Sequence, residues 1–223
     1  MKKCCVIDLG IGNVGSVCRM VKRLGYQPEV VSGEPQTTEK LLPVVMPGVG
    51  HFSKATQSLD RMNLRGWLQD CFAGNVPILG ICLGAQLFCE QSEEGDGRGL
   101  GWVKASVRRF RGEDRSGLPL RVPQMGWRVF APPEGCLPFG VPPGRMYFAH
   151  SYFIEAPENS EMFPCQANYG SVRFTTVVRV GNALGVQFHP EKSHRHGITF
   201  LKAWLDWAGG LAPSSPAVSQ TLG

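Results

Sequence analysis

The first half of the chain alternates short apolar runs with amphipathic segments. Runs of strand length predict strands at residues 4–9, 30–31, 44–46 and 76–81. Segments with apolar residues at helical spacing predict helices at residues 16–24, 52–59, 64–72 and 83–91. Strands that alternate with helices favour a parallel sheet covered by helices on both faces.

The second half has a different pattern, which begins after the acidic and glycine-rich segment 93–97. Short alternating runs separated by Gly and Pro predict strands at residues 103–110, 145–152 and 172–180. Residues 198–207 predict a closing helix, and residues 211–223, rich in Pro, Ser and Ala, predict a flexible tail. We therefore expect one domain over residues 1–210. The predicted fold class is α/β, a three-layer sandwich with a mixed, largely parallel central sheet and a strand-rich, antiparallel second half.

Composition narrows the class of protein. With 43% hydrophobic and 18% charged residues, the chain is typical of a soluble enzyme. The net charge of +5 comes from scattered Lys and Arg, so we expect no nucleic-acid partner. No apolar run approaches the ~20 residues that span a bilayer, so we expect no membrane partner. The eight cysteines show no CxxC pair and no secretion signal precedes them, which favours reduced thiols and a cytoplasmic protein.

Cys82 lies in the segment Gly80-Ile81-Cys82-Leu83-Gly84, where a predicted strand meets a predicted helix. This layout is typical of a nucleophile elbow, in which a sharp turn pushes the side chain outward. The glycines leave room for a substrate carbonyl near the sulfur. Unpaired N–H groups at the start of the helix favour the thiolate, which is the attacking species. We predict that Cys82 is a nucleophile and that cysteines without this pattern are structural.

His189 follows a predicted strand, and Glu191 comes two residues later, after a proline. Catalytic groups collect at strand ends in α/β sheets. His189 can take the thiol proton and return it to a leaving group, while Glu191 orients the ring through its other nitrogen. We predict a Cys-His-Glu triad. A metal site that joins His189 to His194 and His196 is disfavoured, because the spacing lacks the helical His pair of zinc proteases.

Several segments together resemble class I glutamine amidotransferases, and most closely the glutaminase subunits of imidazole glycerol phosphate synthase. The segments that carry the resemblance are Ile7-Asp8 through Gly12-Asn13, Pro47-Gly48-Val49-Gly50, Gly80 through Gln86, Ser92-Glu93-Glu94-Gly95, Met125-Gly126-Trp127, Tyr147 through Tyr152, and Phe188 through Ser193. The resemblance implies hydrolysis of L-glutamine to glutamate and ammonia, without a cofactor. It also implies roles for residues outside the triad. By resemblance, the oxyanion hole comprises Val49 and Leu83, and the substrate-binding residues are Gly48, Gly50, Gln86, Ser151 and Tyr152.

The resemblance further implies a partner, a (β/α)8 cyclase subunit that forms a heterodimer with the glutaminase and uses its ammonia in histidine biosynthesis. A sealed interface delivers ammonia at high effective concentration. The positions that match the family's docking face are Asn13, Trp127, Tyr147 and Lys192. The chain departs from the usual Pro-His-Met-Gly-Trp-Asn pattern at Gln124 and Arg128. We expect this change to alter contacts near the partner.

Three alternatives stay open on the sequence alone. The segment Gly10-Ile11-Gly12-Asn13-Val14-Gly15 fits a dinucleotide-binding GxGxxG pattern, with Glu29 and Glu34 downstream. This interpretation leaves the Cys82 turn and the His189 turn unexplained. The chain could instead be a catalytically silent subunit that only regulates a barrel partner. A third alternative keeps the chemistry but serves another acceptor, as in paralogues that amidate cell-surface sugars.

Overall fold

The computed structural model describes residues 2–35, 42–157 and 161–211. Its helices are α1 (Val14–Arg23), α2 (Phe52–Arg61), α3 (Leu64–Ala73), α4 (Leu83–Gln86), the 3-10 turn η2 (Pro190–Lys192) and α5 (His194–Leu211). Its strands are β1 (Lys3–Ile7), β2 (Gln27–Val31), β3 (Val44–Gly48), β4 (Ile78–Cys82), β5 (Cys89–Ser92), β6 (Val103–Arg109), β7 (Gln124–Phe130), β8 (Gly144–His150), β9 (Tyr152–Glu155), β10 (Cys165–Tyr169), β11 (Val172–Val180) and β12 (Ala183–Val186).

A central sheet organises the molecule. In the described part of the chain it has seven strands, in the order β10-β11-β12-β4-β3-β1-β2. The pairs from β12 through β4, β3 and β1 to β2 are parallel, and the pairs β10–β11 and β11–β12 are antiparallel. The predicted mixed, largely parallel sheet is therefore confirmed.

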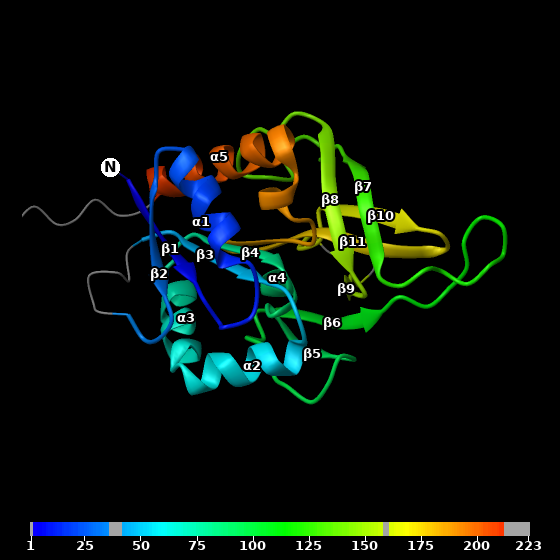
Figure 1. Cartoon of the computed structure of the whole chain (residues 1–223), viewed down its shortest axis with the longest axis horizontal. Helices are drawn as coiled ribbons and strands as arrows, with labels where there is room; N and C mark the ends of the chain where they lie inside the picture. The colour runs from blue at the N-terminus through cyan, green and yellow to red at the C-terminus, as the bar shows by residue number, and fades with distance from the viewer. Residues whose placement is uncertain (1, 36–41, 158–160, 212–223) are drawn as a thin grey trace, which may run out of the picture.

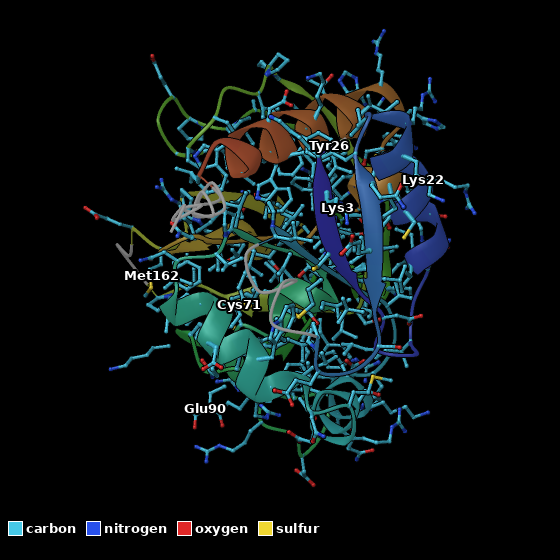
Figure 2. The ribbon with its side chains drawn as sticks, turned by 90° about the vertical axis from the view of Figure 1, so that its left-hand side faces the viewer. Lys3, Lys22, Tyr26, Cys71, Glu90 and Met162 are labelled. Atoms are coloured by element: carbon cyan, nitrogen blue, oxygen red, sulfur yellow. The ribbon has the colours of Figure 1, made fainter. Side chains whose placement is uncertain are left out.

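Helices cover both faces of this sheet, which confirms the three-layer architecture. Figure 1 shows α1 and α5 on one side of the central strands and α2 and α3 on the other. One hydrophobic core joins the α1 and α5 side to the sheet, and a second joins the α2 and α3 side. The turned view in Figure 2 shows Tyr26 near α5, where its hydroxyl donates to the Asp206 carboxylate at 3.1 Å. This bond ties the edge of the sheet to the last helix.

The strand-rich second half extends one end of the molecule (Figure 1). The hairpin of β7 and β8 is antiparallel and pairs Gln124 with His150 and Trp127 with Tyr147. A separate sheet joins β5, β6 and β9, of which β6 and β9 are antiparallel. β8 ends at His150 and β9 begins at Tyr152. The residues of this junction line the same cavity as Cys82, at the carboxyl end of β4.

The predicted helix at 83–91 is wrong beyond its first turn. The helix α4 ends at Gln86, and the strand β5 begins at Cys89 and pairs with β6 in parallel. The carbonyls of Leu87 and Phe88 accept hydrogen bonds from the N–H groups of Leu100 and Val103, at 2.7 and 3.0 Å. These carbonyls are therefore taken by the following loop and strand, and the helix cannot continue through them.

Other boundaries shift by smaller amounts. The strand before His189 is regular only to Val186. The Gln187 N–H still donates to Thr176 of the neighbouring strand β11, in register with the β11–β12 ladder, whereas the His189 N–H donates to Tyr147 of β8. The helix α5 is longer than predicted and includes Leu211. The rest of the predicted tail, 212–223, lies outside the described residues. In the part of the chain that is described, no helix is long and apolar enough to cross a membrane.

The junction of β3, β4 and α4 leaves no space for additional side-chain atoms. A Cβ at Gly84 would collide with the backbone carbonyl of Met46. A Cβ at Gly80 would lie 2.8 Å from the backbone of Ala85, and one at Gly48 would lie 2.9 Å from the N atom of Gly84. Backbone atoms cannot move aside as a flexible side chain can, so these positions require glycine.

We predict that Gly84→Ala lowers the free energy of unfolding by about 3 kcal/mol or more, because the new methyl group meets backbone rather than a movable side chain. Urea unfolding followed by circular dichroism measures the change. The matched control is Gly66→Ala in α3, where the position is exposed and nothing lies within 4 Å of the added Cβ. It should be neutral or stabilising by roughly 0.5–1 kcal/mol. Equal midpoints for the two variants would contradict the close packing at Gly84.

Candidate active site

Cys82 is held in an unusual backbone conformation at the end of β4. Its φ of 54° and ψ of −108° fall outside the regions that side chains other than glycine commonly adopt. Such strain costs on the order of 1–3 kcal/mol and persists where surrounding structure enforces it. The residue is 5% exposed and caps the first turn of α4, whose first N–H belongs to Leu83.

His189 and Glu191 form a buried pair. The Nδ1 atom of His189 lies 2.8 Å from Oε1 of Glu191, and the two side chains are 1% and 4% exposed. Pro190 begins the turn η2, which brings the carboxylate back to the ring. Burial by itself lowers the pKa of His189, but the charge and contact of the Cys82 sulfur, followed by those of Glu191, outweigh burial and raise this pKa to about 10. The imidazole is therefore protonated at neutral pH when the sulfur is a thiolate.

The other ring nitrogen of His189, Nε2, is buried but makes no such contact with a carboxylate. In the described residues Nε2 has no hydrogen-bond partner of standard geometry. Among neighbouring groups, the Cys82 sulfur raises the pKa of the ring most. Catalytic hydrogen bonds are often long before substrate binds and then tighten. The arrangement therefore leaves Nε2 of His189 available for proton exchange with the Cys82 sulfur.

The backbone around His189 is fixed by a closed ring of three hydrogen bonds. The N–H of His189 donates to the Tyr147 carbonyl at 2.9 Å. The Ser193 hydroxyl donates to the His189 carbonyl at 2.6 Å and accepts from the Tyr147 N–H at 2.9 Å. Because Ser193 is fully buried, this ring excludes water and ties the turn η2 to β8.

A cavity of ≈ 180 Å³ opens beside Cys82. Its lining comprises Val49, Gly50, Cys82, Leu83, Gln86, Glu94, Pro123, Ala149, His150, Ser151 and Tyr152. The lining brings together all the predicted oxyanion and substrate positions except Gly48. Gly48 pairs with Cys82 in the sheet and packs against Leu83 instead. His189 and Glu191 are not part of the lining.

Two titratable residues of this lining had no predicted role. Burial raises the pKa of the Glu94 carboxyl, and its Oε2 accepts from the Phe52 N–H at 2.9 Å. Burial lowers the pKa of His150 to about 3, so its ring is neutral. Nδ1 of His150 lies 2.8 Å from the Tyr152 carbonyl, which can only accept, so this nitrogen carries the proton. The segment Ser92-Glu93-Glu94-Gly95 was a signal for Glu94, but only through resemblance.

The predicted docking residues lie in elements that contact one another: α1 with η2, η2 with β8, and β8 with β7. The ring of Trp127 stacks on His194 at 5.3 Å and meets Tyr147 edge-on at 5.7 Å. The side chain of Asn13 accepts from the Ser16 N–H and caps α1, and Lys192 is exposed on η2. The four positions therefore come from adjoining elements.

The two departures from the family pattern differ in their surroundings. Gln124 is 1% exposed, and both polar atoms of its side chain lack hydrogen-bond partners in the described structure. It lies opposite His150 in the β7–β8 hairpin, so it cannot contact a partner directly. The guanidinium of Arg128 lies 4.8 Å from the centre of the Tyr169 ring and is engaged within the chain.

Among residues 2–35, 42–157 and 161–211, no group of three His, Cys, Asp or Glu side chains could hold a metal ion. His194 stacks on Trp127 in the first turn of α5. His196 lies beside Gly144 and Arg195. The three histidines considered for a metal site thus contact different residues: His189 pairs with Glu191, His194 stacks on Trp127, and His196 lies beside Arg195.

Comparison with known proteins gives a family and close relatives. Residues 5–205 match the model of the family described as glutamine amidotransferase class-I. The chain is 38% identical over 208 residues to "Imidazole glycerol phosphate synthase subunit HisH" of Geobacillus kaustophilus, covering 92% of this chain and 97% of that protein. It is 39% identical over 211 residues to the protein of the same name from Neisseria meningitidis, covering 91% and 98%.

Solved structures agree in fold. One described as "Crystal structure of glutamine amidotransferase" has a TM-score of 0.67 and 16% identity, covering 92% of this chain and 98% of that one. The structure of PurLQS from Thermotoga maritima has a TM-score of 0.64 and 16% identity, covering 93% and 96%. At this identity the likeness concerns the fold alone. Because the family model spans nearly the whole described chain and full-length relatives share more than a third of its residues, the chain belongs to the class-I glutamine amidotransferase family.

Proposed function

We propose that this chain is the glutaminase subunit of an imidazole glycerol phosphate synthase. It hydrolyses L-glutamine to glutamate and ammonia and passes the ammonia to a (β/α)8 cyclase subunit for histidine biosynthesis. Relatives that match nearly the whole chain carry this name, which favours this acceptor over a cell-surface sugar. The observation that carries the chemistry is the buried His189–Glu191 pair, whose ring also interacts with the Cys82 sulfur.

The reaction begins with attack of the Cys82 thiolate on the side-chain amide carbon of glutamine. Protonated His189 gives its proton to the departing nitrogen, so ammonia leaves and a γ-glutamyl thioester remains. The now neutral ring accepts a proton from water, which attacks the thioester. Glutamate leaves and the thiolate is restored. Throughout, Glu191 holds Nδ1 and so keeps Nε2 directed toward the reacting atoms.

The oxyanion of each tetrahedral intermediate is stabilised by the backbone N–H groups of Val49 and Leu83. Both residues line the cavity next to Cys82. Preorganised donors of this kind contribute roughly 3 kcal/mol each to transition-state stabilisation. The close packing of Gly48 against Leu83 and Gly84 keeps the two backbones at contact distance, which supports this assignment.

Glutamine binds in the cavity of ≈ 180 Å³, which is smaller than the ~300–1,000 Å³ typical of drug-sized ligands. We assign Gln86, Ser151 and Tyr152 to the substrate, with the loop of Gly48 and Gly50 alongside. The Glu94 carboxylate supplies the negative charge that suits the α-ammonium group of an amino acid.

The cyclase docks on the face that carries Asn13, Trp127, Tyr147 and Lys192. Next to Trp127, the side chains of Met125 and Val129 are 65% and 74% exposed, so β7 presents a row of apolar groups. Exposed apolar rows of this kind mark protein interfaces, and Trp, Tyr and Met are enriched there.

We also propose a cytoplasmic location, where thiols stay reduced. In the described structure no cysteine forms a disulfide.

Replacement of the nucleophile tests the function. We predict that Cys82→Ala abolishes glutamine-dependent formation of imidazole glycerol phosphate by the chain co-purified with the cyclase, since no thioester can form. Ammonium salts should still support the reaction of the complex. Cys136→Ala is the matched control and should retain the glutamine-dependent rate. If Cys82→Ala keeps that rate, the chain is a silent regulatory subunit.

The triad carboxylate controls the pH dependence. In the wild-type chain, hydrolysis should decline as the pH rises through about 10, where the raised pKa of His189 lets the ring lose its proton. We predict that Glu191→Gln moves this decline to lower pH, because the carboxylate helps to raise that pKa. The turnover number should fall on the order of 100-fold or more. A pH profile of glutamate release in the complex measures both, and Glu90→Gln, an exposed charge loss, should change neither. An unmoved decline in Glu191→Gln would exclude the ion pair.

The docking face can be tested by affinity. We predict that Trp127→Ala weakens binding of the cyclase by about 10-fold or more, because the few residues that carry most of the binding energy of an interface are enriched in Trp. Isothermal titration calorimetry of the two purified subunits measures the dissociation constant. Leu118→Ala, at a position 62% exposed and on the loop before β7, serves as the control and should bind as the wild type does. Equal affinities for both variants would move the interface elsewhere.

A further inference from the structure

Gln187 is a buried polar residue next to the proposed nucleophile, and the mechanism above does not use it. It follows β12 directly and is 3% exposed. Its N–H donates to the Thr176 carbonyl at 3.0 Å, which fixes the backbone. Its side-chain Nε2 lies 3.5 Å from the Cys82 sulfur. A buried amide beside a reacting atom needs a physical reason, since burial without partners is costly.

The orientation of this amide follows from a chain of bonds that begins at a backbone carbonyl. The Tyr152 carbonyl can only accept, so the group 2.8 Å from it must be Nε2 of Gln86. The same Nε2 lies 3.1 Å from the side chain of Gln187, which must therefore present its oxygen to Gln86. With the oxygen committed, the NH2 group of Gln187 points at the sulfur. The amide of Gln187 is thus set as a donor to Cys82.

We propose that Gln187 is a further catalytic residue, whose side-chain amide donates a hydrogen bond to the Cys82 sulfur and stabilises its thiolate form. This inference rests on the proposed function, because it assigns Gln187 to the same nucleophile. A hydrogen bond to a charged acceptor is roughly twice as strong as one between neutral groups. The donor therefore favours the thiolate over the thiol and over the neutral thioester sulfur.

The same bond acts at two points of the cycle. Before attack it holds a negative sulfur in a buried site, where His189 is the opposing positive charge. During thioester hydrolysis the sulfur regains negative charge as the leaving group, and the donor is already in place. The chain from Tyr152 through Gln86 to Gln187 also joins the cavity wall to the nucleophile.

Two substitutions separate the donor from the other contacts. Gln187→Glu keeps the shape and an oxygen that accepts from Gln86, but places a second oxygen against the sulfur. Gln187→Met removes both polar groups. We predict that each variant raises the pH midpoint for alkylation of Cys82 by iodoacetamide by about one pH unit. The increase should be larger for Gln187→Glu than for Gln187→Met. Mass spectrometry of the peptide that contains Cys82 follows the reaction in the full-length chain.

Glutamine turnover by the complex gives a second readout. For Gln187→Glu the turnover number at neutral pH should fall about tenfold, while KM for glutamine changes less, because the contact with Gln86 remains. Gln57→Glu, which adds the same charge at an exposed position, should match the wild type in both readouts. Wild-type alkylation midpoints in variants whose urea unfolding is also wild-type would overturn the role of Gln187. Alkylation needs no glutamine, so this result is distinct from failure of the proposed function, which appears as no glutamine hydrolysis by the wild-type complex.

Discussion

The strained turn at Cys82 is the constraint on which the site depends. A residue other than glycine keeps a φ of 54°, as Cys82 does, only where the surrounding structure enforces this backbone conformation. Here Gly80 and Gly84 lie against backbone on both sides of the turn, and Gly48 lies against the same junction from β3. The strain at residue 82 is therefore held by packing at three glycines. This packing also sets the distance between the loop of Val49 and the first N–H of α4.

A second constraint is the burial of charge. A carboxylate, an imidazolium and a thiolate in a site that excludes water would be costly unless each had partners. Glu191 holds one nitrogen of His189, and the sulfur acts on the other face of the ring. The hydrogen-bond ring through Tyr147 and Ser193 holds the backbone of the histidine turn. The charged groups thus come from the end of β4 and from the segment after β12, its parallel neighbour in the central sheet, and β8 of the separate hairpin fixes the backbone of that segment.

Local pattern was sufficient for most of the fold, because the strands β3 and β4 and the helices α2 and α3 each have a periodicity that tertiary contacts do not overrule. It was insufficient at residues 87–91, where the carbonyls of Leu87 and Phe88 bond to residues more than ten positions away. The turns at Cys82 and His189 were visible as motifs. Gln187 and Glu94 were not, since their contacts with Cys82 and Phe52 join segments that are 105 and 42 residues apart. No short-range pattern encodes such distances.

Tyr147 of β8 contacts both the proposed docking face and the turn that carries His189. The ring of Tyr147 meets Trp127 edge-on at 5.7 Å on the exposed side, while the backbone of Tyr147 bonds to His189 and to Ser193 on the buried side. Trp127 in turn stacks on His194, the residue after Ser193, which has a positive φ of 46°. Tyr147 and His194 thus place this face next to both ends of the turn that carries His189 and Glu191. This proximity arises because the β7–β8 hairpin lies beside the carboxyl ends of β4 and β12, where catalytic groups collect: Ala149 and His150 line the cavity together with Cys82, and the Tyr147 carbonyl accepts from the His189 N–H.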